Sequence, residues 1–188
     1  MKQYANRNEG FTLLEILVVL VILGVVVGAV AVAIPSDTPS QLVDKSVDRF
    51  MTFSDHATET ALIGGETVGL IVMPPKWRED PFTQGWAYRW QKETPQGWVD
   101  IPDLMPVEIP LEVELIITIQ EKEWAYDKAP EIQAPIIAFY PSGEVTPFEV
   151  EFVHTESDVD PQNVMVNEWG ELVWQQRQEA LEEAERGF

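Results

Sequence analysis

A single acidic residue, Glu15, lies near the start of an otherwise apolar run that extends from Phe11 to Ile34. As one helix this run would rise roughly 36 Å, which is enough to cross a hydrocarbon core of about 30 Å. An ionised carboxylate inside such a span costs about 2.5–3.5 kcal/mol on insertion scales, so it usually pairs with a cation. The run contains no cation. The candidate partner is an amine made by cutting the chain just before Phe11, in this chain or in a neighbouring one.

The residues around this point resemble the class III signal of type IV pilins and type II secretion pseudopilins. A short polar leader ends at Gly10, Phe11 follows, Glu15 lies four positions later, and a long hydrophobic run continues from there. The resemblance implies that a prepilin peptidase cuts between Gly10 and Phe11 on the cytoplasmic side and methylates the new amine of Phe11. It also implies that Glu15 pairs with the Phe11 amine of an adjacent subunit during filament assembly.

Two other interpretations of the apolar run compete with this one. An ordinary secretory signal has an apolar core of about 7–15 residues and a small-x-small exit, and Ala31-Val32-Ala33 offers such an exit. The run is too long for that interpretation, and Glu15 suits such a core poorly. A plain membrane anchor explains the length of the run but leaves Glu15 unexplained.

Charges on either side of the run predict its orientation. Lys2 and Arg7 precede it, whereas Asp37 and Asp44 follow it, and cytoplasmic flanks carry the excess of basic residues. With the resemblance, this predicts a single-pass protein of the bacterial inner membrane with a cytoplasmic N-terminus and a periplasmic C-terminal domain. The 188 residues include no Cys and carry a formal net charge of −20. The domain must therefore hold together by its core alone, and its charge argues against a nucleic-acid partner.

Breaks in the residue pattern divide the chain into parts. Pro35 lacks the amide hydrogen that an unbroken helix requires, and Thr38, Pro39 and Gln41 form the start signal of a new helix with a capping box. Gly64-Gly65 is a natural stop for that helix. We predict a cleaved leader (1–10), a transmembrane helix (11–34), a kink and periplasmic amphipathic helix (35–65), a β-rich periplasmic domain (66–175) and an acidic tail (176–188), the tail being a short solvated helix or disordered.

After Gly65, apolar and aromatic residues follow the two-residue period of β-strands. Trp86, Tyr88 and Trp90 alternate along one strand face, which is more typical of a core than of a binding surface. Gly143 can take the positive φ of a turn that would join residues 136–140 and 147–153 as the two strands of a hairpin. The expected strands are residues 67–73, 85–91, 112–120, 136–140, 147–153, 164–166 and 172–174. The fold class is α+β, with a long N-terminal transmembrane and spine helix packed on an antiparallel two-layer β domain, as in pilins.

Two motifs in the β half narrow the resemblance. Residues 137–148 resemble a hairpin, and residues 167–172 the closing strand pair, of the GspH-type minor pseudopilin of the type II secretion system. This implies a structural subunit at or near the tip of the periplasmic pseudopilus, which helps drive folded exoproteins through the outer-membrane secretin. The implied partners are other pseudopilins (major and minor tip subunits), the prepilin peptidase and the inner-membrane assembly platform. A minor pilin of a type IV pilus or competence system is the nearest alternative.

Residues that usually carry chemistry form no recognisable catalytic motif. The chain has two His, His56 and His154, and lacks Cys, Gly-x-Ser-x-Gly, His-Glu-x-x-His and a phosphate-binding loop. The acidic loop 156–163 lacks the central Gly and distal Glu of a calcium-binding EF-hand loop. We therefore expect no enzymatic activity, no cofactor and no metal ion.

Seven Trp leave one binding alternative open. Trp77 is flanked by Pro and charged residues, so we expect it to lie in a polar loop and to be a possible partner contact. A membrane-anchored periplasmic carbohydrate-binding module is the less favoured function that such aromatic residues would serve.

Overall fold

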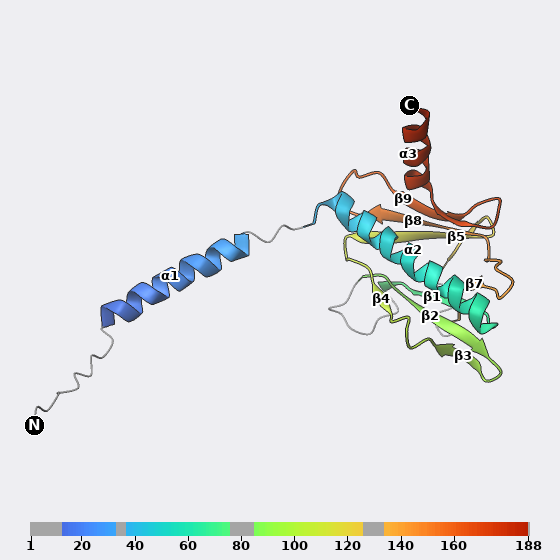
Figure 1. Ribbon diagram of the computed structural model, residues 1–188, viewed down its shortest axis with the longest axis horizontal. Coiled ribbons are helices and arrows are strands. Elements are labelled where there is room, and N and C mark those ends of the chain that lie inside the picture. Colours follow the sequence, from blue (N-terminus) through green and yellow to red (C-terminus); the bar gives the residue numbers. More distant parts are fainter. Residues whose placement is uncertain (1–12, 33–36, 76–84, 126–133, 188) are drawn as a thin grey trace, which may run out of the picture. The chain divides into compact units, whose positions relative to one another are not determined.

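The computed structural model describes residues 13–32, 37–75, 85–125 and 134–187 (Figure 1). The chain divides into two compact units, Met1–Asp37 and Thr38–Phe188. In the described residues the first unit contains one helix, α1, and the second contains helices α2 and α3 and every strand.

Helix α1 runs from Leu13 to Val32, and Glu15 is its only charged residue. Every side chain from Leu13 to Val26 is exposed, Leu14 to 73%. A helix that is hydrophobic all round is normally buried, in a protein core or in a membrane. Among the helices as far as they are described, none is both long and apolar enough to cross a membrane. The predicted span of residues 11–34 extends past α1 at both ends, outside the described residues, and stays a prediction.

Helix α2 spans Pro39–Gly64, and the sequence signals at its two ends are present in the structure. The Gln41 amide donates to Thr38 Oγ1 at 3.3 Å, and the Thr38 amide donates to Gln41 Oε1 at 3.0 Å, so the predicted capping box is confirmed. Gly65 takes a φ of 67°, and its amide donates to the Ala61 carbonyl. That left-handed residue ends the helix at little steric cost.

The strands form two antiparallel sheets, each of five strands. Sheet A has the order β3-β2-β1-β7, with β4 also paired to β2; its strands are β1 (Val68–Met73), β2 (Ala87–Thr94), β3 (Gly97–Asp100), β4 (Val107–Glu108) and β7 (Ile137–Phe139). Sheet B has the order β10-β9-β8-β5-β6; its strands are β5 (Val113–Ile119), β6 (Lys122–Glu123), β8 (Phe148–His154), β9 (Gln162–Val166) and β10 (Leu172–Trp174). Helix α2 lies across both sheets and contacts strands of each (Figure 1).

Phe50 of α2 joins the two sheets into one hydrophobic core. Its ring centroid lies 5.4 Å from that of Tyr88 in sheet A and 5.7 Å from that of Phe152 in sheet B, both in edge-to-face geometry. The predicted placement of alternating aromatic residues in the core is confirmed, because Tyr88 and Trp90 of β2 and Trp86 directly before it are buried. The alternation predicted for β5 is also present, with Val113, Leu115 and Ile117 buried and the residues between them exposed.

The predicted hairpin of residues 136–140 and 147–153 is wrong in one respect, because its two strands belong to different sheets. Gly143 does take a positive φ, of 87°, and the turn closes as expected. The Thr146 amide donates to the Ala138 carbonyl at 2.9 Å, but the next residue is Pro147, which has no amide hydrogen with which to extend the pairing. The chain therefore crosses from β7 in sheet A to β8 in sheet B.

Three short strands, β3, β4 and β6, were not expected from the sequence. Strands β5 and β6 are joined by Gln120 and Glu121, whose φ angles are 49° and 66°. Two consecutive left-handed residues match a type I′ hairpin turn, which normally contains Asn or Gly. Neither is present here, so the sequence carries no turn signal at this point.

The acidic tail, for which the sequence left two alternatives, contains a helix. Helix α3 spans Gln175–Arg186, directly after β10, and none of its residues is buried. Its first turn is tied down, because Gln176 accepts a hydrogen bond from the Asn163 amide at 2.8 Å. Beyond this turn the helix stands away from the sheets (Figure 1).

Candidate functional site

Of the residues predicted to function, Glu15 lies within the described part of the chain, whereas Gly10, Phe11 and Trp77 lie outside it. Glu15 is in the first turn of α1. The amide groups of a first helical turn carry partial positive charge, so a carboxylate is favourable there. The side chains on either side of it, Leu14 and Ile16, are exposed.

The N-terminal end of α1 combines one carboxylate with an exposed apolar surface. An extended exposed apolar surface marks a region that contacts a membrane or another protein. Within a lipid or a helix bundle, the carboxylate of Glu15 would be stabilised most strongly by a cation placed directly against it. The recognition of an amine on an adjacent chain by Glu15 stays a prediction.

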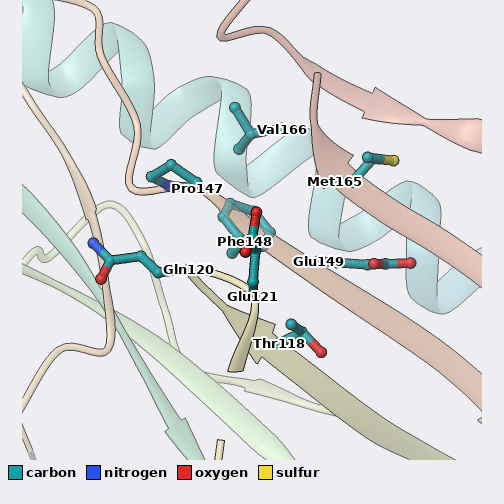
Figure 2. A pocket seen from close by; sticks show the side chains of 8 residues that line it. All are labelled: Thr118, Gln120, Glu121, Pro147, Phe148, Glu149, Met165 and Val166. Atoms are coloured by element: carbon teal, nitrogen blue, oxygen red, sulfur yellow. The ribbon is translucent and has the colours of Figure 1, made fainter. Parts of the chain in front are cut away.

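A hollow of about 470 Å³ lies at one end of sheet B. Thr118, Glu149 and Met165 are neighbours across β5, β8 and β9 and line one side of it (Figure 2). The strained turn residues Gln120 and Glu121 also line it. Its polar lining consists of one hydroxyl, one amide and two carboxylates, from Thr118, Gln120, Glu121 and Glu149.

Two other titratable residues, His154 and Tyr88, lie in the folded domain away from this hollow. His154 ends β8, and its ring Nδ1 accepts a hydrogen bond from the Glu156 amide at 3.2 Å. Burial raises the pKa of Tyr88 far above its usual value. Within the described residues, no group of three or more His, Asp or Glu side chains could hold a metal ion.

Sequence reasoning missed a second hollow, of about 440 Å³, between α2 and the segment formed by β10 and α3. Its two walls are joined by an ion pair of 3.2 Å between Arg177 Nη1 and Asp48 Oδ1, residues that are 129 positions apart. The tail was expected to be either a short solvated helix or disordered, and no local pattern indicated that it would meet α2.

Comparison with known proteins defines the class to which this fold and this N-terminal helix belong. The model of the prokaryotic N-terminal methylation motif matches residues 5–31, the segment that contains Gly10, Phe11 and Glu15. Two solved structures of the minor pseudopilin EpsH from the type 2 secretion system of Vibrio cholerae share the fold, with TM-scores of 0.52 and 0.53 at 20% and 23% sequence identity. The alignments cover 70% and 71% of this chain and 94% and 92% of those chains. The chain is thus a pilin-like protein with a long N-terminal helix and an α+β fold.

The sequence itself narrows the class to a family. Over 173 residues the chain is 30% identical to the type II secretion system protein H of Aeromonas hydrophila, and the match covers 89% of this chain and 93% of that protein. The chain belongs to the type II secretion system protein H family, the GspH-type minor pseudopilins. Its partners are accordingly other pseudopilins and the secretion machinery, and pseudopilins with the methylation motif are membrane-anchored periplasmic proteins.

Proposed function

We propose that this minor pseudopilin is made as a precursor, is cut between Gly10 and Phe11 by the prepilin peptidase, and is methylated on the new Phe11 amine. Residues 11–34 then hold the mature chain in the bacterial inner membrane as a single pass. The N-terminus faces the cytoplasm and the domain from Thr38 onward faces the periplasm. The match of the methylation motif to residues 5–31 supports this processing.

Glu15 would act when the inner-membrane assembly platform extracts the subunit into the pseudopilus. In this proposal its carboxylate pairs with the methylated Phe11 amine of the next subunit, which sets the register between neighbouring helices. The single observation that carries the proposal is the position of Glu15, the only charge in the apolar first turns of α1. Losing one partner of a desolvated ion pair costs about 3–5 kcal/mol, which is enough to select correctly paired subunits.

The domain from Thr38 onward would serve as a structural adaptor at or near the tip of the pseudopilus. It would contact the major subunit and the minor tip subunits while the pseudopilus helps drive folded exoproteins through the outer-membrane secretin. We propose a structural and not an enzymatic role for it, as expected of a minor pseudopilin, and the match to the type II secretion system protein H supports this role. Trp77 is proposed as a further partner contact.

The N-terminus of the mature chain tests this proposal directly. The full-length protein is purified from membranes of cells with and without the prepilin peptidase, and its intact mass and N-terminal sequence are measured. With the peptidase, the chain should begin at N-methylated Phe11, and a Gly10→Lys variant should keep its leader. A chain that begins at Ile34 would mean that the apolar run is a discarded signal and would end the proposal.

A further inference from the structure

The hollow between α2 and α3 is a groove with one apolar and one acidic side. We call it the α2–α3 groove and define it by Met51 and Asp55 on α2 and by Leu172, Trp174, Arg177 and Leu181 on β10 and α3. Met51, Leu172 and Trp174 are half-buried, whereas Leu181 is 61% exposed. The groove therefore presents an apolar surface that the domain itself covers only in part.

Contacts within the first turn of α3 hold this groove open in a defined shape. Arg177 pairs with Asp48 at 3.2 Å, and its guanidinium also lies over the Trp174 ring, 5.6 Å from the ring centroid. Gln176 is fixed by the amide of Asn163 and by the carbonyl of Pro161, to which its Nε2 donates at 3.1 Å. The base of α3 is therefore attached to α2 on one side and to β9 and the residue before it on the other.

The wall formed by α2 is acidic. Asp48, Asp55 and Glu59 are spaced by seven and four residues, which places them on one face of the helix. Arg177 neutralises Asp48, but among the described residues no cation pairs with Asp55. Partial burial and the charge of Glu59 raise the pKa of the Asp55 carboxyl. A cation brought by another molecule would relieve this unfavourable environment.

We propose that the α2–α3 groove docks a basic, amphipathic helical segment of a different pseudopilin. An apolar side chain of that segment packs between Met51, Trp174 and Leu181, and a neighbouring Lys or Arg pairs with Asp55. Charge disfavours the other occupants, because each copy of this chain carries −20 and would repel a second copy or an anionic lipid surface. The inference rests on the proposed assembly into a pseudopilus and adds the partner chemistry and the surface that it uses.

Site-specific photo-crosslinking of the full-length chain tests the groove in cells that contain the complete secretion system. The photoreactive residue p-benzoylphenylalanine replaces Leu181 in the groove or, as a matched control, the exposed Met105 on the β domain. From position 181 we expect a crosslink to another pseudopilin, mapped by mass spectrometry to a segment with Lys or Arg beside an apolar residue. From position 105 we expect none.

A second variant tests the role of charge. Asp55→Lys should lower the yield of the crosslink from position 181 about fivefold or more, since a single ion pair at the surface contributes up to about 1 kcal/mol and reversal adds repulsion. Asp103→Lys, at an exposed position outside the groove, should leave the yield unchanged. Equal loss in both variants would contradict the proposal.

The outcomes separate this inference from the proposed function when the N-terminal mass is measured in the same samples. One outcome is a processed chain that co-purifies with other pseudopilins but gives no crosslink from position 181, or a crosslink to a second copy of itself. That outcome would contradict the docking proposed for the α2–α3 groove and leave the proposed function standing. An unprocessed chain without a crosslink would contradict both the proposed function and the docking at the groove.

Discussion

Helix α1 and the domain from Thr38 onward use apolar residues in opposite ways. In α1 all the described side chains are exposed, and the helix has no core of its own. In the domain, apolar residues from α2 and both sheets form one buried cluster with Phe50 between the sheets. The domain therefore derives its stability from within, whereas α1 must obtain its stability from a membrane or from neighbouring subunits.

Because of this difference, mutations in the domain core and mutations in α1 should harm the protein in different ways. A change in the core should lower the free energy of unfolding without altering what α1 recognises. A change at Glu15 should leave the domain folded but remove its ability to assemble. Each prediction below tests one side of this separation, and they run from the largest expected effect on domain stability to the smallest.

Phe50→Ala should lower the free energy of unfolding of the domain by about 3–5 kcal/mol, because it leaves a cavity where the two sheets meet. Urea unfolding of the full-length chain in detergent, followed by Trp fluorescence, measures this loss. Val99→Ala, on β3 at a position that is 40% exposed, should change the stability by much less, about 0.5–1 kcal/mol. Equal effects of the two substitutions would mean that Phe50 does not join the sheets.

Gly69→Ala should destabilise sheet A by about 1–3 kcal/mol through overpacking. A Cβ atom on Gly69 would overlap with the Pro135 ring and would lie 2.8 Å from Trp98 Cζ3. The control is Gly64→Ala at the end of α2, where a Cβ atom would meet nothing within 4 Å. Thermal unfolding of both variants should show a lower midpoint for the first alone, and no difference would contradict the packing of β1.

Replacing Gln120 by Asn and Glu121 by Gly should stabilise the domain by about 1 kcal/mol, since each left-handed non-Gly residue costs roughly 1–2 kcal/mol. Chemical denaturation of the double variant measures the gain. If stability falls, the turn side chains make contacts that outweigh their backbone strain. Their position on the rim of the hollow in sheet B would then be the first place to look for such contacts.

Asp55→Asn should have the smallest effect, a gain in stability of less than about 0.5 kcal/mol at pH 7. The pKa of Asp55 is raised above 3.8 in the folded chain, so the folded state binds its proton more tightly than the unfolded state. The protonated Asp55 carboxyl therefore contributes to the stability of the wild-type domain below about pH 3.8. This contribution is lost as the pH rises through the folded pKa. The gain from Asn should therefore disappear below pH 3.8, and a gain that persists there would contradict the electrostatic cause.

Local signals in the sequence predicted much of this fold. The capping box of Thr38 and Gln41, the buried face of β2 and the alternation of β5 depend on neighbouring residues, so the sequence displays them directly. The crossing between β7 and β8 depends on which sheet each strand joins, which a turn motif does not specify. The Gln120–Glu121 turn carries no Gly or Asn to reveal it. The α2–α3 groove depends on a contact between residues 129 positions apart.

Among the candidate functional residues, too, some could be identified from local sequence and others only from contacts between distant residues. Glu15 could be identified from sequence because a carboxylate in an apolar run is costly and therefore conspicuous. Asp55 could not be distinguished from the other acidic residues of a chain with 32 Asp and Glu, because its significance comes from the apolar surface that β10 and α3 place opposite it.

The most direct test of the separation is the incorporation of Glu15 variants into the pseudopilus. Wild-type, Glu15→Val and Glu15→Asp chains are produced with all other subunits, and the fraction of each chain that co-purifies with the pseudopilus is measured. We predict that Glu15→Val is processed and keeps the wild-type unfolding midpoint of the domain but is absent from the pseudopilus, with Glu15→Asp intermediate. Incorporation of Glu15→Val at the wild-type level would contradict the claim that α1 is ordered by charge recognition between subunits.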